Sequence, residues 1–138
     1  MADKIRLRLV TPSRLLCDEE VDEVTAPGAL GEFTVLPDHI AFLTLLEIGE
    51  MSYKQGNQRP RLAVSGGYAE VLENVMTVLA DAAEYADEID IEQARKDKER
   101  AEKRKEELAP DDQAYQAVET ALRRATVRLQ VASKEARH

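Results

Sequence analysis

The chain has 138 residues and carries 27 acidic side chains against 19 lysines and arginines, which gives a net charge of −8. This balance argues against nucleic acid as a partner, because binding to phosphates needs a clustered excess of Lys and Arg. A single cysteine, Cys17, excludes an internal disulfide, and no apolar run is long enough to cross a membrane. We therefore expect any membrane association to come through other proteins.

Charge and composition divide the chain near Asp87. Residues 1–87 carry 15 acidic and 7 basic side chains, whereas residues 88–138 carry 12 of each. All the glycines and both phenylalanines also precede residue 88. The sequence therefore predicts two domains, residues 1–87 and residues 88–138.

Short strands of period two fill the first domain. Alternation in residues 4–10 places Ile5, Leu7 and Leu9 on one face of a strand. Turn residues separate further expected strands at 23–26, 33–36, 42–53, 61–64, 68–72 and 75–79. This spacing predicts an antiparallel β-sandwich or flattened barrel. The pair Gly66-Gly67 is expected to supply a positive φ angle; a phosphate-binding loop would need a following Gly-Lys-Ser/Thr, which is absent.

The second domain has helical periodicity. Asp90 and Gln93 have the spacing of a capping box, which predicts a helix running to Leu108. The segment 110–112, Pro-Asp-Asp, ends that helix and caps the next one. The second helix has an unbroken heptad seam of Tyr115, Val118, Leu122, Ala125, Leu129 and Ala132. The chain is therefore expected to be an α+β protein, with a β-sandwich followed by an antiparallel two-helix hairpin.

Packing within this hairpin is expected to be thin. Lys98 and Lys105 interrupt the apolar seam of the first helix. Burying a leucine contributes roughly 1.5–3 kcal/mol and alanine far less, whereas ordering the backbone costs about 1–2 kcal/mol per residue. The pattern leaves two interpretations open, a solvated coiled-coil arm and a movable arm.

No catalytic or metal-binding constellation is found in the sequence. His39 is one of only two histidines, and no HExxH motif, cysteine pair, Walker loop or Gly-x-Ser-x-Gly elbow is present. We expect no catalytic residues, no bound metal and no enzymatic activity of the chain itself.

A basic face is expected on the second helix, where Arg123, Arg124 and Arg128 lie close together in an otherwise acidic chain. Such a face suits an acidic protein surface as its partner. The alternative is that these charges only keep the helix soluble and favour its C-terminal dipole.

Three segments carry a family resemblance: residues 31–49 (GEFTVLPDHIAFLTLLEIG), 65–71 (SGGYAEV) and 75–80 (VMTVLA). In this order and spacing they closely resemble the epsilon subunit of bacterial and chloroplast F-type ATP synthases. The resemblance implies a non-catalytic subunit of the central stalk that couples the gamma subunit to the c-ring. It also implies that a movable hairpin inhibits ATP hydrolysis, with Arg123, Arg124 and Arg128 contacting an acidic segment of the catalytic beta subunit. No transit peptide is recognised, so we expect a peripheral position on the cytoplasmic side of a bacterial inner membrane.

The resemblance also bears on nucleotide binding, because some bacterial members bind ATP on the hairpin through an Ile/Leu-Asp-x-x-Arg-Ala motif and further arginines. Residues that match this pattern or lie near its supporting arginines are Ile89, Asp90, Ala94, Arg100, Arg124 and Arg128. Gln93 stands in place of the motif's arginine. Losing a charge-assisted hydrogen bond costs roughly 1.5–3 kcal/mol, or on the order of ten- to a hundredfold in affinity. Regulatory ATP is therefore expected to bind weakly or not at all, and no other cofactor is expected.

A different class of protein also fits the pattern: a free-standing acidic adaptor that dimerises through Leu122 and Leu129. Co-purification separates the two interpretations, since a synthase subunit travels with gamma and c whereas an adaptor does not.

Overall fold

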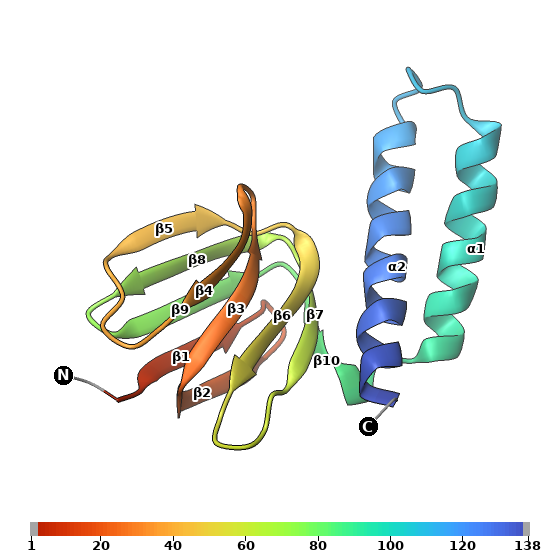
Figure 1. The fold of residues 1–138 in the computed structure, drawn as a ribbon. Coiled ribbons are helices and arrows are strands. Elements are labelled where there is room, and N and C mark those ends of the chain that lie inside the picture. The colour runs from red at the N-terminus through yellow and green to blue at the C-terminus, as the bar shows by residue number, and fades with distance from the viewer. Residues whose placement is uncertain (1–2, 137–138) are drawn as a thin grey trace. The chain divides into compact units, whose positions relative to one another are not determined.

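The computed structural model describes residues 3–136 and the side chains of residues 3–133 (Figure 1). The chain forms two compact units that divide after Tyr85. No helix within residues 3–136 is both long and apolar enough to cross a membrane.

The first unit is a β-sandwich of two five-stranded sheets. One sheet has the strand order β2-β1-β9-β8-β5 and the other β10-β7-β6-β3-β4. All pairings between neighbouring strands are antiparallel except that of β1 with β9. The strands are β1 (Ile5–Val10), β2 (Leu15–Val21), β3 (Glu23–Gly28), β4 (Gly31–Val35), β5 (Phe42–Leu45), β6 (Ile48–Lys54), β7 (Arg61–Ser65), β8 (Gly67–Leu72), β9 (Val75–Ala80) and β10 (Ala83–Tyr85).

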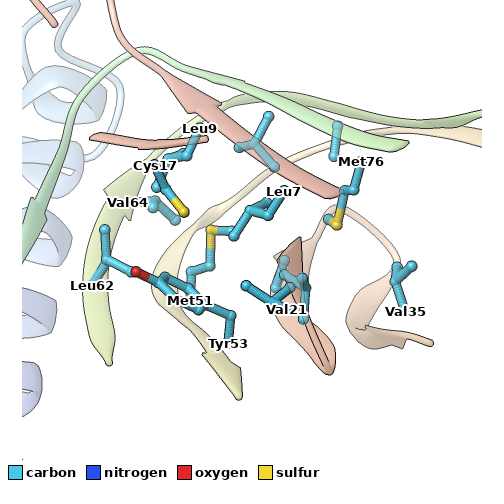
Figure 2. Close-up of a cluster of buried hydrophobic side chains, with 14 of the residues drawn as sticks. Leu7, Leu9, Cys17, Val21, Val35, Met51, Tyr53, Leu62, Val64 and Met76 are labelled. Carbon is cyan, nitrogen blue, oxygen red and sulfur yellow. The ribbon is translucent and has the colours of Figure 1, made fainter. Parts of the chain in front are cut away.

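Alternating apolar residues of both sheets meet in one core. Ile5, Leu7 and Leu9 of β1 are fully buried, as the period-two pattern predicts. Figure 2 shows Leu7 and Leu9 facing Met51 and neighbouring side chains of the other sheet. The predicted fold class, a sandwich followed by a helical hairpin, is confirmed.

The structure contains two strands that the sequence pattern does not predict, β2 and β10, and the boundaries of others differ from the prediction. The expected single strand over residues 42–53 is two strands, because the chain leaves one sheet after β5 and enters the other at β6. The strand expected at residues 23–26 extends to Gly28 as β3, and the turn follows at residues 29–30. Pro27 is tolerated in β3 because the pairing of this strand with β6 stops at Thr25. The Pro27 carbonyl accepts a hydrogen bond from the Glu47 N–H at 2.8 Å.

Positive φ angles shape the two turns that flank β8. Gly66 has φ +71° and Gly67 has φ +109°, which confirms the predicted role of this pair. Glu73 and Asn74 have φ angles of 50° and 64°, as a two-residue type I′ hairpin turn between β8 and β9 requires.

The second unit is an antiparallel helical hairpin. It contains a short 3₁₀ helix η1 (Ala86–Glu88), followed by α1 (Ile91–Glu107) and α2 (Tyr115–Ala136). Asp90 caps α1 as predicted, since its side chain accepts a hydrogen bond from the Gln93 N–H at 3.0 Å. The other half of the predicted capping box, in which the Gln93 side-chain oxygen would accept a hydrogen bond from the Asp90 N–H, is wrong: the Gln93 side-chain amide instead donates forward to Asp97 at 2.8 Å.

Small residues form much of the seam between α1 and α2. Ala94 and Ala101 of α1 are buried, as are Val118, Ala125 and Ala132 of α2. The larger seam residues Leu122 and Leu129 are only partly buried. The hairpin is therefore held by little apolar area, as the sequence predicts.

Candidate functional site

A groove of about 420 Å³ runs along the hairpin between α1 and α2. Its lining residues are basic side chains, one carboxylate and small apolar residues: Asp97, Arg100, Ala101, Arg104, Ala117, Val118, Ala121, Arg124, Ala125 and Arg128. We call this feature the arginine groove.

Helical spacing explains the composition of the arginine groove. Asp97, Arg100 and Arg104 lie at i, i+3 and i+7 on α1, and Arg124 and Arg128 lie at i and i+4 on α2, so each set shares one helix face. The alanines leave space that a larger side chain would fill. Four guanidinium groups and one carboxylate give a site whose chemistry suits a multiply charged anion.

Asp97 lies at the centre of the polar contacts in this groove. Its Oδ1 accepts the hydrogen bond from the Gln93 side chain and lies 3.7 Å from Nη1 of Arg100. Its Oδ2 lies 3.7 Å from Nη1 of Arg128, on the other helix. A single carboxylate thus connects α1 to α2.

The structure brings three of the six predicted nucleotide-site residues together. Arg100, Arg124 and Arg128 all line the arginine groove. Ile89, Asp90 and Ala94 are not among its lining residues. Ile89 and Ala94 are buried, and Asp90 is the N-cap of α1.

The three arginines predicted to contact beta do not share one environment. Arg124 and Arg128 line the arginine groove, whereas Arg123 does not and is exposed. Sequence reasoning missed two groove residues, Asp97 and Arg104. Their spacing from Arg100 on α1, three residues before and four after, was the signal that could have found them.

A second candidate site is the outer face of the sheet that contains β5, β8 and β9. Strand register aligns one apolar residue from each of its five strands in a single row: Leu45, Tyr68, Leu79, Val10 and Leu15. We call this the apolar row. A strand in a sheet with one solvated face normally alternates apolar-in and polar-out, so a continuous apolar row on the outside indicates a contact surface.

Charged residues occupy the rest of this outer face at the β1–β2 side. The Arg6 side chain donates a hydrogen bond to Asp18 at 2.9 Å, and this bond lowers the pKa of Asp18 below its ordinary value. A hydrogen bond from Lys4 likewise lowers the pKa of Asp22. The face thus has an apolar part and a charged part, which would orient a partner.

Polar groups inside the sandwich are paired with one another. The Tyr85 hydroxyl donates to the Leu16 carbonyl at 3.1 Å, so the Tyr53 hydroxyl, 2.9 Å from it, donates to Tyr85. Burial raises the pKa of Tyr53 above its ordinary value, and it also raises the pKa of the Cys17 thiol. These groups stabilise the core, and their pairing indicates no catalytic or ligand-binding role.

His39 has a structural role in its loop. Its Nδ1 lies 2.8 Å from the Ile40 carbonyl oxygen, and its ring contacts that of Phe42 with 5.7 Å between centroids. Within residues 3–136, no group of three or more His, Cys, Asp or Glu side chains is placed to hold a metal ion.

Two family models match the chain and together span most of it. Residues 4–86 match the ATP synthase delta/epsilon chain β-sandwich domain, and residues 87–133 match the long α-helix domain of the same family. This chain belongs to the ATP synthase delta/epsilon chain family.

Curated relatives narrow this assignment to the epsilon type. The chain is 53% identical to the ATP synthase epsilon chain of Geobacter metallireducens over 137 residues, with 99% of each chain covered. It is 47% identical, with the same coverage, to the ATP synthase epsilon chain 2 of Syntrophotalea carbinolica. The predicted resemblance to epsilon subunits of F-type ATP synthases is confirmed.

Solved structures agree with this result. A chain of the Euglena gracilis mitochondrial ATP synthase (OSCP/F1/c-ring) matches with a TM-score of 0.82 and 25% identity, covering 100% of this chain and 84% of that one. A chain from the central stalk and c-ring of the Tetrahymena thermophila mitochondrial ATP synthase shares the fold, with a TM-score of 0.64, 16% identity and 94% of each chain covered.

Proposed function

We propose that this chain is a non-catalytic subunit of the rotor stalk of an F-type ATP synthase. Its sandwich joins the gamma subunit to the ring of c subunits, and it lies on the cytoplasmic side of the inner membrane without contacting lipid itself. Family membership supports this role over that of a free-standing adaptor. The observation that carries it in this molecule is the apolar row, which we assign as the docking surface for gamma.

The energetic value of this surface can be estimated from one leucine. Leu45 is 66% exposed, and fully burying a leucine contributes roughly 1.5–3 kcal/mol. Covering Leu45 with a partner would therefore contribute about 1–2 kcal/mol, or roughly five- to thirtyfold in the dissociation constant. The row spans five strands, so contacts along its whole length would make a stable interface.

The proposal is tested with full-length Leu45→Glu and a matched control, Thr34→Glu. Each variant adds one carboxylate at an exposed strand position, but Thr34 lies on β4 of the other sheet. Binding to purified gamma should weaken by about tenfold or more in Leu45→Glu and stay unchanged in Thr34→Glu. Equal binding by the two variants would show that gamma docks elsewhere.

The hairpin is proposed as the regulatory part of the chain. In an extended state, Arg123, Arg124 and Arg128 would contact an acidic segment of the beta subunit and inhibit ATP hydrolysis. In the closed state, any nucleotide would use Arg100, Arg124 and Arg128 of the arginine groove. The segment at the start of α1, with the buried residues Ile89 and Ala94 and the N-cap Asp90, would position the helix that carries Arg100. The small apolar seam favours such movement, because little buried area is lost when the helices separate.

A further inference from the structure

We propose that the Asp97 carboxylate takes the place of a bound anion in the arginine groove. It pairs with arginines of the groove and thereby excludes polyphosphate. The hairpin of this chain would then close without a ligand. This inference concerns the regulation of the proposed arm and rests on that role for its consequence in the complex.

The contact between Asp97 and Arg128 is the central element, because it joins the two helices in the more sheltered part of the groove. The Arg128 side chain is 24% exposed and that of Asp97 36% exposed. Arg100, the other arginine beside Asp97, is 74% exposed, so its ion pair contributes little to the energy. Removing the carboxylate would therefore act mainly through Arg128.

Gln93 holds the carboxylate in this position. Its side-chain amide donates to Oδ1 of Asp97, while Oδ2 faces Arg128. Gln93 and Asp97 lie one helical turn apart on α1, so this hydrogen bond restrains the carboxylate rotamer from within that helix. The two side chains form one unit that presents a negative charge to α2.

A bound phosphate group would have to compete with this carboxylate. It would need the Arg128 guanidinium and would lie beside the negative charge of Asp97, and both effects weaken binding. Without that charge, the groove presents four guanidinium groups and no carboxylate. Removing it should therefore strengthen polyphosphate binding by about ten- to a hundredfold.

The test is calorimetric titration of the isolated full-length chain with inorganic tripolyphosphate and, separately, with ATP. Asp97→Asn removes the charge and keeps the shape, and Glu99→Gln removes one charge from an exposed position of α1 outside the groove. We expect the Asn variant to bind tripolyphosphate at least about tenfold more tightly than the wild type, with no gain in the Gln variant. Tighter binding of ATP as well would show that the groove accepts a nucleotide, and binding of tripolyphosphate alone that it recognises only the phosphates.

Three results would overturn the proposal: wild-type binding as tight as that of Asp97→Asn, an equal gain in both variants, or no polyphosphate binding by Asp97→Asn. If this variant has lost helix by circular dichroism, added tripolyphosphate should restore it, and failure to do so counts equally against the proposal. Because the titration involves no other subunit, its outcome is independent of whether the sandwich docks on gamma.

Discussion

Gly67 is the position where a single methyl group should damage the sandwich most. A Cβ atom at this residue would lie 2.1 Å from the carbonyl oxygen of Leu79 and 2.7 Å from the Cα of Ala80. Both are backbone atoms of β9, which pairs with β8 along its whole length. They cannot rotate away as a side chain would, so Gly67→Ala must displace one strand against the other.

The cost of Gly67→Ala has two parts, and Gly31→Ala isolates one of them. Both glycines have positive φ angles, +109° at Gly67 and +123° at Gly31, and placing an alanine there costs on the order of 1–3 kcal/mol. A Cβ at Gly31 meets nothing within 4 Å, so that variant has only this backbone cost. At Gly67 the overlap with β9 adds roughly 1–3 kcal/mol of overpacking, for a total of about 2–6 kcal/mol.

Urea unfolding of the full-length chain, followed by circular dichroism near 217 nm, measures both costs. The free energy of unfolding should decrease from wild type to Gly31→Ala and further to Gly67→Ala, with the second step at least about 1 kcal/mol. Domains are stable by only about 5–15 kcal/mol, so loss of the cooperative transition in the Gly67 variant would be the extreme of the same result. Equal stability of the two variants would refute the reasoning, since it would mean that β8 and β9 separate without cost.

Three other expectations concern individual side chains or a small set of them. Burial and the contact with Tyr85 raise the pKa of Tyr53 above its ordinary value of 10.0, so the folded protein keeps this proton at a pH where the unfolded chain loses it. Stability should therefore fall as the pH rises above about 10, and the urea midpoint of Tyr53→Phe should fall less steeply. In the assembled synthase, replacing Arg123, Arg124 and Arg128 together by alanine should raise ATP hydrolysis while the subunit stays bound; unchanged hydrolysis in an inhibited preparation would contradict the beta contact. Gln93→Arg should tighten ATP binding measured by calorimetry, and the absence of any gain both in this variant and in Gln93→Arg combined with Asp97→Asn would mean that the groove arginines do not converge on a nucleotide.

The period-two pattern predicted the strands that alternate cleanly, but not the points where the chain changes sheet. Residues 42–53 are apolar enough to look like one strand, and only the tertiary pairing of Leu46 with Gly28 shows that the chain turns there. Strand β2 was missed because its segment Cys-Asp-Glu-Glu is acidic. Its exposed carboxylates are accepted since β1 places Arg6 and Arg8 opposite them.

The arginine groove was only partly predictable for a similar reason. Spacing along α2 placed Arg124 and Arg128 on one face, and the groove contains both. The sequence does not decide the role of Gln93, because two local hydrogen bonds are open to its side chain. The Gln93 side chain can accept a bond from the cap N–H behind it or donate one to Asp97 one helical turn ahead, and in the structure it donates to Oδ1 of Asp97 while Oδ2 meets Arg128 of the other helix. The sequence alone predicts the first helix, but it does not show that the second helix places the charge of Arg128 beside Asp97.

Alanines between the two helices account for both the groove of the hairpin and its weak packing. Alanines at positions 101, 117, 121 and 125 leave the space that the arginines surround, and they also contribute little apolar area to closure. Ion pairs between the helices, Asp97 with Arg128 at 3.7 Å and Lys105 with Glu119 at 3.9 Å, therefore provide a larger share of the stability of the hairpin than they would in a leucine-packed hairpin. Such partly exposed pairs are weakened by salt, whereas the buried core of the sandwich is not. If the hairpin is the regulatory arm proposed above, its closure should thus respond to ionic conditions and to competing acidic surfaces that leave the sandwich unchanged.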